Sequence, residues 1–182
     1  LDRAQEGPLV LIIHTHATEA YTGSPDFHST DPEKSVVRVG QAIADALNAR
    51  GIPTVHETSL IDLGNYNDAY PRMAGLAEDW LARYPSIQMV LDVHRDSLET
   101  DDGTQLALRA DVANAARLQA LCEQRAPGLM RDLLLRASRY NQHLTPRSML
   151  LEVGTAGNSL EEALRSADIF SQVLADCLLG KA

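Results

Sequence analysis

Two histidines and a glutamate follow the first apolar run of the chain, in the sequence HTHATE. His14 and His16 are two positions apart, so both point to the same side if residues 9–15 form a strand. Beyond the strand, the chain can turn and bring Glu19 back towards His16. Imidazole and carboxylate groups suit a catalytic zinc ion, which takes three protein ligands and keeps one position for water. The alternative is a pair of hydrogen-bonded histidines at a sheet edge.

A second set of polar groups lies in the sequence MVLDVHRD, where His94 ends another apolar run. Asp92 faces the same side of that strand as His94 and could orient it as a metal ligand. Arg95 and Asp96 either form a local ion pair that shapes the loop or contact a substrate. The catalytic loop of protein kinases also contains HRD, but no glycine-rich phosphate loop or DFG triplet accompanies it here.

A third set lies in the sequence SMLLEVGTAGN, where Glu152 interrupts a buried apolar run. An unpaired buried carboxylate is costly, so we expect Glu152 to be paired, protonated or directed at a polar site. Next to an activated water molecule, it would act first as general base and then as general acid. Asn158 is explained by a position at the start of the following helix. The other histidines, His28, His56 and His143, are expected at the surface, although the loop of His28 could fold over the site.

Apolar periodicity predicts that strands and helices alternate along the chain. Continuous apolar runs are typical of strands covered on both faces, and apolar residues at spacings of three and four indicate helices. The predicted strands span residues 9–15, 52–56, 87–94 and 148–153, with the second at the sheet edge because it contains Pro53. The predicted helices span residues 36–50, 71–84, 111–125 and 128–138, and a last helix begins after a cap at Asn158 or Ser159.

This alternation predicts a single α/β domain over residues 1–182. We expect three layers, with a mainly parallel central sheet flanked by helices on both faces. In such sheets, binding and catalytic sites form at the carboxyl ends of the strands. The ends of three predicted strands carry His16, His94 and Glu152, so these side chains should meet at one edge of the sheet.

Composition excludes several classes of function. The formal charge of −9 and the pI of about 5.0 argue against a nucleic-acid-binding surface, which needs a basic stripe. No run of Lys or Arg is present that could form a polybasic membrane patch. Cys122 and Cys177 lie in separate helical patterns and are expected to be small buried side chains, with a disulfide between them left open. The chain begins with LDRAQEGP and has no initial Met, which indicates an excised fragment whose membrane anchor would lie outside it.

These motifs together resemble the stage II sporulation protein P family, which are zinc-dependent N-acetylmuramoyl-L-alanine amidases. The resemblance covers most of the chain, in the order LIIHTHATEAY, VVRVGQAIADALNARGI, LDVHRD, PGLMRDLLLRASRYNQHL and SMLLEVGTAGNSLEEALRSA. It implies the zinc-amidase fold, a zinc ion held by two histidines and a glutamate, and a catalytic glutamate after the last strand.

Carried over to this chain, the resemblance implies His16, Glu19 and His94 as metal ligands and Glu152 as the catalytic residue. In the wider amidase group the carboxylate ligand lies further along the chain, where Asp31 and Glu33 are the alternatives to Glu19. The segment between Arg95 and Asp111 is short for the extra strand and the long connection that the family usually has there. This member either lacks them, or part of the segment is missing.

The resemblance also implies a function in sporulation and engulfment. The expected reaction is hydrolysis of the amide between N-acetylmuramic acid and L-alanine of peptidoglycan, by zinc-activated water, outside the cytoplasmic membrane. Stage II sporulation proteins D and M are the implied partners, and His14 would support a ligand or face substrate. The alternatives are a phosphoesterase that uses H-x-H as paired metal ligands, and a non-catalytic domain that binds the cell wall or acts as a scaffold.

Overall fold

The computed structural model describes residues 1–2, 4–99, 106–110, 112–132 and 140–181, which form an α/β fold around a five-stranded sheet. The strand order is β2-β1-β3-β5-β4, and all neighbouring strands are parallel except β4, which is antiparallel to β5. The strands are β1 (Val10–Ile13), β2 (Thr54–His56), β3 (Met89–Asp96), β4 (Leu106–Ala110) and β5 (Met149–Thr155).

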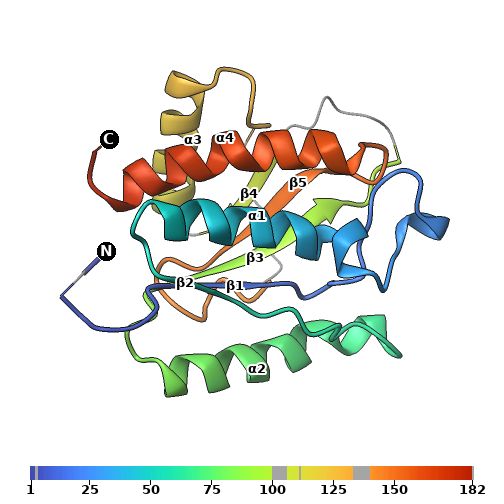
Figure 1. Ribbon diagram of the computed structural model, residues 1–182, viewed down its shortest axis with the longest axis horizontal. Coiled ribbons are helices and arrows are strands. Elements are labelled where there is room, and N and C mark those ends of the chain that lie inside the picture. The colour runs from blue at the N-terminus through green and yellow to red at the C-terminus, as the bar shows by residue number, and fades with distance from the viewer. Residues whose placement is uncertain (3, 100–105, 111, 133–139, 182) are drawn as a thin grey trace.

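Helices cover both faces of this sheet, which confirms the predicted three-layer arrangement. In Figure 1, α1, α3 and α4 lie on one side of the sheet and α2 lies on the other. The helices are α1 (Val36–Ala49), α2 (Ala69–Arg83), α3 (Val112–Arg125) and α4 (Leu160–Leu178). Three short 3-10 helices are η1 (Pro25–Phe27), η2 (Pro32–Lys34) and η3 (Tyr66–Asp68).

Burial of the sheet on both faces explains why its strands are apolar throughout. Alternate residues of β1 pack into two separate cores, because neighbouring side chains of a strand point to opposite faces. Val10 and Ile12 contact the α1 and α4 side, and Leu11 and Ile13 contact the α2 side. The polar residues of β3 and β5 therefore have to be satisfied inside the protein or at the ends of the strands.

Two local details differ from the predictions. A strand, β4, is present between Arg95 and Asp111, where the chain seemed too short to hold both an extra strand and a long connection. Residues 128–132, predicted as the start of a helix, instead pair with the start of this strand: Leu106 donates to Leu129 O, and Arg131 donates to Leu106 O. The rest of that predicted helix, residues 133–138, lies outside the described residues.

Two further expectations concern cysteines and membranes. Cys122 and Cys177, between which a disulfide was left open, are free thiols and form no disulfide with each other. In the described part of the chain, no helix has both the length and the apolar character needed to cross a bilayer.

Candidate metal centre

His16, Glu19 and His94 lie together at the carboxyl ends of β1 and β3. The chain turns immediately after β1 ends at Ile13, and this turn carries His16 and Glu19 to the end of the neighbouring strand. One ligand atom from each of the three residues lies within 4.8 Å of the other two. His16 Nδ1 is 3.6 Å from Glu19 Oε1, and His94 Nδ1 is 3.2 Å from Glu19 Oε2. All three side chains are buried, so the group is enclosed by protein.

Asp92 lies beside the imidazole of His94, on the same face of β3. Its Oδ1 lies 3.0 Å from His94 Nε2, on the side of the ring opposite Glu19. Thr15 fixes this carboxylate by donating from its backbone N at 2.9 Å and from its hydroxyl at 2.6 Å. Carboxylates that hold the far nitrogen of a ligand histidine set its tautomer and its orientation.

Two carboxylates around one imidazole make this part of the site favourable for a positive charge. Burial alone would lower the pKa of His94, but Asp92 and Glu19 raise it well above its usual value. Burial would raise the pKa of Glu19, but His94, a hydrogen bond from His16, and Arg95 together lower it. Asp92 likewise has a lowered pKa despite its burial, because His94 and Thr15 stabilise the ionised form. The site therefore holds a proton or a cation between ionised carboxylates.

Glu152 lies beside this group because of the sheet register. It is the direct neighbour of His94 across β3 and β5, and it is buried. Directly paired residues of neighbouring strands point to the same face of a sheet, so the side chains of Glu152 and His94 lie on one face. This places a further carboxylate next to the three potential ligands.

His14 does not join the group, and the expectation that it shares a side with His16 was wrong. Since β1 ends at Ile13, the period of two stops applying before His16. His14 is fully buried; its Nδ1 donates to Val93 O at 2.9 Å, and its Nε2 lies 2.7 Å from His56 Nε2. Burial and the neighbouring His56 lower the pKa of His14 to about 3, so it stays neutral.

Arg95 and Asp96 do not form the local ion pair that was one of the two predictions. Arg95 donates from Nε to Ala20 O and from Nη2 to Phe27 O, each at 3.0 Å. Its guanidinium therefore holds the loop that follows Glu19 against the end of β3. The carboxylate of Asp96 instead pairs with Arg131 Nη2 at 3.0 Å.

The remaining predicted residues lie at the rim or on neighbouring turns. Asn158 accepts from Thr155 N at 2.9 Å and so shapes the turn after β5, whereas Ser159 is the residue that caps α4. Asp31 and Glu33, the alternatives to Glu19, are exposed and pair with Lys34 and Arg38 respectively. His28 lies beside the site, because residue 28 forms a β-bridge with Glu19.

Tyrosines lie against the two histidines, and they were not among the residues predicted from the sequence. The ring of Tyr66 is stacked on that of His16, with centroids 3.9 Å apart and planes 8° from parallel. Tyr70 lies nearly parallel to His94 at 6.2 Å and meets His16 edge-on at 5.2 Å. Both tyrosines belong to NYNDAY, which leads from β2 into α2. The only available signal was that this connection leaves the carboxyl end of a strand.

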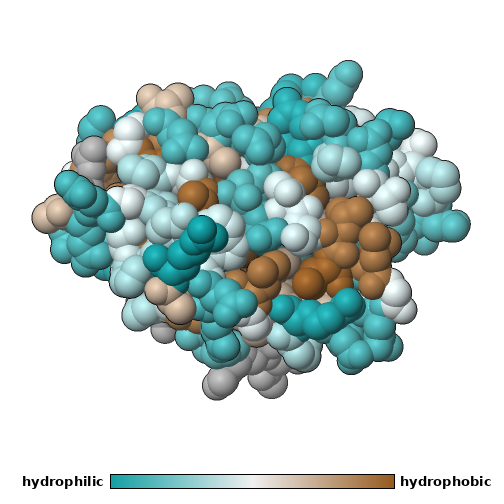
Figure 2. All heavy atoms as spheres, turned by 60° about the horizontal axis from the view of Figure 1, so that its bottom comes forward, coloured by the Kyte–Doolittle hydropathy of each residue, from teal (hydrophilic) through white to brown (hydrophobic). Residues whose placement is uncertain are grey.

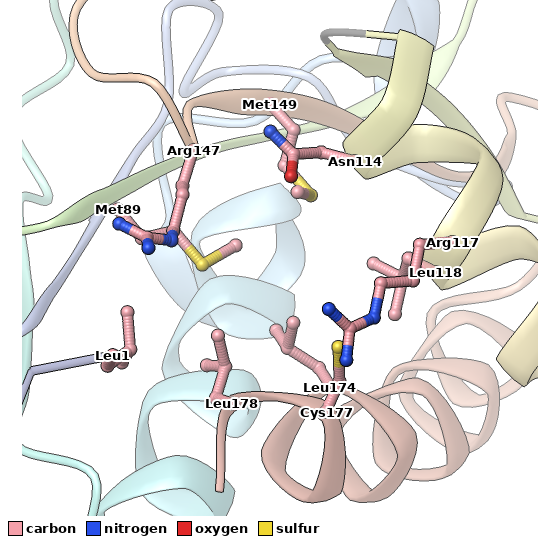
Figure 3. Close-up of a pocket in the computed structure, with 10 residues that line it drawn as sticks. All are labelled: Leu1, Met89, Asn114, Arg117, Leu118, Arg147, Met149, Leu174, Cys177 and Leu178. Atoms are coloured by element: carbon pink, nitrogen blue, oxygen red, sulfur yellow. The ribbon is translucent and has the colours of Figure 1, made fainter. Parts of the chain in front are cut away.

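A separate hollow lies at the opposite end of the sheet. Figure 3 shows it between α3, α4 and the first residues of two strands, Met89 of β3 and Met149 of β5. Its volume is about 170 Å³, and Arg117 and Arg147 are among its lining residues. Since none of the predicted site residues lines it, this hollow is unrelated to the candidate metal centre.

Solved structures with the same arrangement of strands and helices define the class of fold. N-acetylmuramoyl-L-alanine amidase AmiC2 of Nostoc punctiforme matches with a TM-score of 0.61 and 16% identity, over 96% of this chain and 99% of that one. The CwlD amidase of Clostridioides difficile, solved in complex with the GerS lipoprotein, matches with a TM-score of 0.60 and 13% identity, over 96% and 100%. The zinc-free form of YNDL matches with a TM-score of 0.52 and 17% identity, over 95% of this chain and 84% of that one. The fold is thus that of the zinc amidases.

Sequence similarity is more specific than fold. The model of the stage II sporulation protein P family matches residues 2–112 and 107–175. Stage II sporulation protein P of Bacillus subtilis (strain 168) is 30% identical over 223 aligned residues, which cover 96% of this chain and 55% of that protein. The chain belongs to the stage II sporulation protein P family, and it spans about half the length of this relative.

Proposed function

We propose that this chain is a zinc-dependent amidase domain that acts on peptidoglycan during sporulation. The bond cleaved would be the amide between the lactyl group of N-acetylmuramic acid and L-alanine of the stem peptide. The observation that carries this proposal is the convergence of His16, Glu19 and His94, with Glu152 next to His94 across the sheet. Membership of the stage II sporulation protein P family and the amidase fold support it.

The residues present fit a zinc ion. Two imidazoles and one carboxylate are a common ligand set of catalytic zinc sites. Glu19 directs one carboxylate oxygen at each histidine, and His16 Nε2 is buried without a hydrogen-bond partner among the described residues. His16, Glu19 and His94 would hold the ion, and Asp92 would keep His94 in the tautomer whose Nδ1 is available. A bound zinc ion would supply the positive charge that lowers the pKa of water to about 7.

Glu152 would carry out the proton transfers of the reaction. As general base, it takes a proton from the water molecule that attacks the amide carbon. It then donates this proton to the nitrogen of the leaving L-alanine, so that a neutral amine departs and the carboxylate is restored. Burial of the site excludes bulk water, and Arg95 supports it by holding the loop that follows Glu19.

The alternative of an H-x-H phosphoesterase is not compatible with this geometry. That class of site needs His14 and His16 as neighbouring ligands of the same ion. Both ring nitrogens of His14 are already bonded, to Val93 O and to His56. The two histidines therefore serve different parts of the structure.

The test is a comparison of Glu152→Gln with the wild type and with Glu161→Gln, an exposed glutamate on α4 as matched control. Purified peptidoglycan is digested, and mass spectrometry identifies released stem peptides with a free L-alanine amino group. We expect kcat to fall by about 10²- to 10⁴-fold in Glu152→Gln, because general acid–base catalysis is lost. Both variants should keep about one zinc ion per chain, as in other zinc sites of this ligand type.

Normal turnover by Glu152→Gln would contradict the role of that residue. If the wild type retains no zinc after purification in zinc-containing buffer and releases no stem peptide, the chain is instead a wall-binding or scaffolding domain. If the wild type binds zinc but cleaves another bond, the proposed metal site stands and only the proposed substrate is wrong.

The biological setting follows from the family and is also part of the proposal. Peptidoglycan as substrate implies that the domain works outside the cytoplasmic membrane, attached through a segment beyond this chain. Stage II sporulation proteins D and M are proposed as partners in engulfment. Co-purification of the full-length protein with each of them, with and without peptidoglycan, tests this.

A further inference from the structure

Most of the large exposed apolar side chains lie on connections that leave the carboxyl ends of strands. Among the described residues, four large hydrophobic side chains are at least 41% exposed, and three of them follow the carboxyl ends of strands. Leu63 and Tyr66 lie on the connection after β2, and Leu98 follows β3; the fourth, Ile169, lies on α4. Figure 2, with the α2 side brought forward, shows a hydrophobic patch on the side to which the strands run in Figure 1. Exposed apolar patches beside a site mark surfaces that bind ligands.

Tyr66 connects this apolar rim directly to the metal centre. Its ring is stacked on His16, and the residue is still 49% exposed. Burial, followed by the negative charge of Glu19, raises the pKa of the phenol to about 12, so the side chain is neutral at physiological pH. An uncharged aromatic ring next to a metal ligand offers a flat surface for stacking rather than a charge.

The connection that carries Tyr66 is held in place by its own polar residues. Asn65 accepts from the backbone N of Asn67 at 3.2 Å, and its amide donates to the carboxylate of Asp68. Arg72 of α2 donates from Nε to Asp68 O at 3.3 Å and from Nη2 to Asn65 O. Tyr66 is therefore positioned before any ligand binds, which lowers the entropic cost of binding.

The polar groups beside Tyr66 are engaged within the protein. The guanidinium groups of Arg95 and Arg72 are bonded to backbone carbonyls. The surface that Tyr66 offers is therefore the face of an uncharged aromatic ring, which suits a neutral ring of the ligand.

We propose that Tyr66 binds the sugar of the substrate, by stacking against the pyranose ring of N-acetylmuramic acid. This inference rests on the proposed function. In the substrate, the lactyl carboxyl group of this sugar is part of the scissile amide, so the sugar is neutral, while the stem peptide carries free carboxylates. Leu63 extends the surface beyond Tyr66 and lines a hollow of about 420 Å³ together with Thr18 and His28, into which the glycan strand could continue.

Binding is measured by calorimetry with zinc-loaded Glu152→Gln protein, so that no turnover occurs. The two probes are a disaccharide–tripeptide and the same tripeptide without sugar. Tyr66→Ala should weaken binding of the sugar-containing probe by about two- to twelve-fold, the usual effect of one aromatic stacking contact. It should leave binding of the free tripeptide unchanged, and Tyr66→Phe should bind both probes as the parent does.

Three controls separate sugar binding from a structural role. Tyr66→Leu keeps an apolar cover on His16 but has no flat ring, so it should behave as Tyr66→Ala while its zinc content equals that of the parent. Ile169→Ala removes an equally exposed hydrophobic side chain far from the site and should change neither affinity. With Glu152 intact, Tyr66→Leu should raise KM for peptidoglycan fragments by the same factor and leave kcat within about two-fold, as expected for uniform binding.

The proposal is overturned if Tyr66→Leu binds the sugar-containing probe as tightly as the parent, or if both probes are weakened equally. It is also overturned if the zinc-loaded parent does not bind the sugar-containing probe. Failure of the proposed function gives a different result: the probe binds in a Tyr66-dependent manner, but the wild type releases no stem peptide.

Discussion

Gly40 lies in the middle of α1, directly over the pair formed by the buried His14 and the half-buried His56. A Cβ atom at this position would lie 2.4 Å from His14 Nε2, 2.6 Å from His14 Cε1 and 2.9 Å from His56 Nε2. Contacts this short require a shift of the ring. His14 cannot move freely, because it is fully buried and bonded to Val93 O and His56. We therefore predict that Gly40→Ala destabilises the protein.

Three contributions determine the change in the free energy of unfolding: the first stabilises the protein, and the other two destabilise it. Replacement of Gly by Ala inside a helix normally stabilises it by about 1 kcal/mol. Overpacking of a buried site costs about 1–3 kcal/mol. Displacing His14 from its partners leaves buried nitrogen atoms unsatisfied, at a cost of about 1–3 kcal/mol. The net loss in the free energy of unfolding is about 1–5 kcal/mol, and a loss near 3 kcal/mol lowers the Tm of a chain of this size by roughly 6–12 °C.

Gly75→Ala is the matched control for this experiment. Gly75 lies inside α2, is exposed, and would place its Cβ where no other atom lies within 4 Å. It should gain the helix propensity without the clash and raise the free energy of unfolding by roughly 0.5–1 kcal/mol. Urea denaturation of both variants and the wild type measures the two changes. If Gly40→Ala is as stable as Gly75→Ala, the close packing of α1 on the histidine pair is refuted.

Three more predictions concern the site. Asp92→Asn should weaken zinc binding by about 10- to 100-fold, since His94 loses its orienting carboxylate, as measured by competition with a chelator. Removal of zinc with EDTA should lower the Tm, because Glu19 and His94 then lose a ligand that stabilises only the folded state. The free energy of unfolding should fall between pH 6.5 and pH 4.5. The unfolded chain then binds protons that His14 and His56, with pKa values of about 3 and 4, do not bind when folded. The loss is at most roughly 1.4 kcal/mol per histidine per pH unit, and His56→Gln should show a shallower slope in urea denaturation.

The fold could be predicted from the sequence because its strands are buried on both faces. Runs such as residues 9–13 and 89–91 are apolar without alternation, and this pattern is typical of parallel sheets between helices. The strand β4 escaped prediction because it is a short antiparallel strand at the sheet edge, in a polar segment. The segment after Pro127 has the composition of a helix, but residues 129–131 pair with Leu106 instead. Tertiary pairing there outweighed local propensity.

Individual site residues could be identified where they interrupt an apolar strand. A carboxylate or imidazole inside a buried run is costly, so Asp92, His94 and Glu152 had to have partners in the folded protein. The positions of His14 and Asp96 could not be predicted in the same way. Their partners, His56 and Arg131, are distant in sequence, and the first strand ends at Ile13, two residues before its predicted end.

Tyr66 shows the limit of sequence reasoning most clearly. An aromatic residue in a polar connection costs the chain little, so its presence at residue 66 predicts nothing about a site. Its importance comes from the crossover between β2 and α2, which brings the ring onto His16, fifty residues earlier in the chain. Residues that are costly to bury can be identified in the sequence, whereas a residue at the rim can be identified only once the fold places it against the candidate metal ligands. The proposed chemistry could therefore be predicted from the sequence more readily than the proposed substrate recognition, and the Tyr66 variants test the part that only the structure supplies.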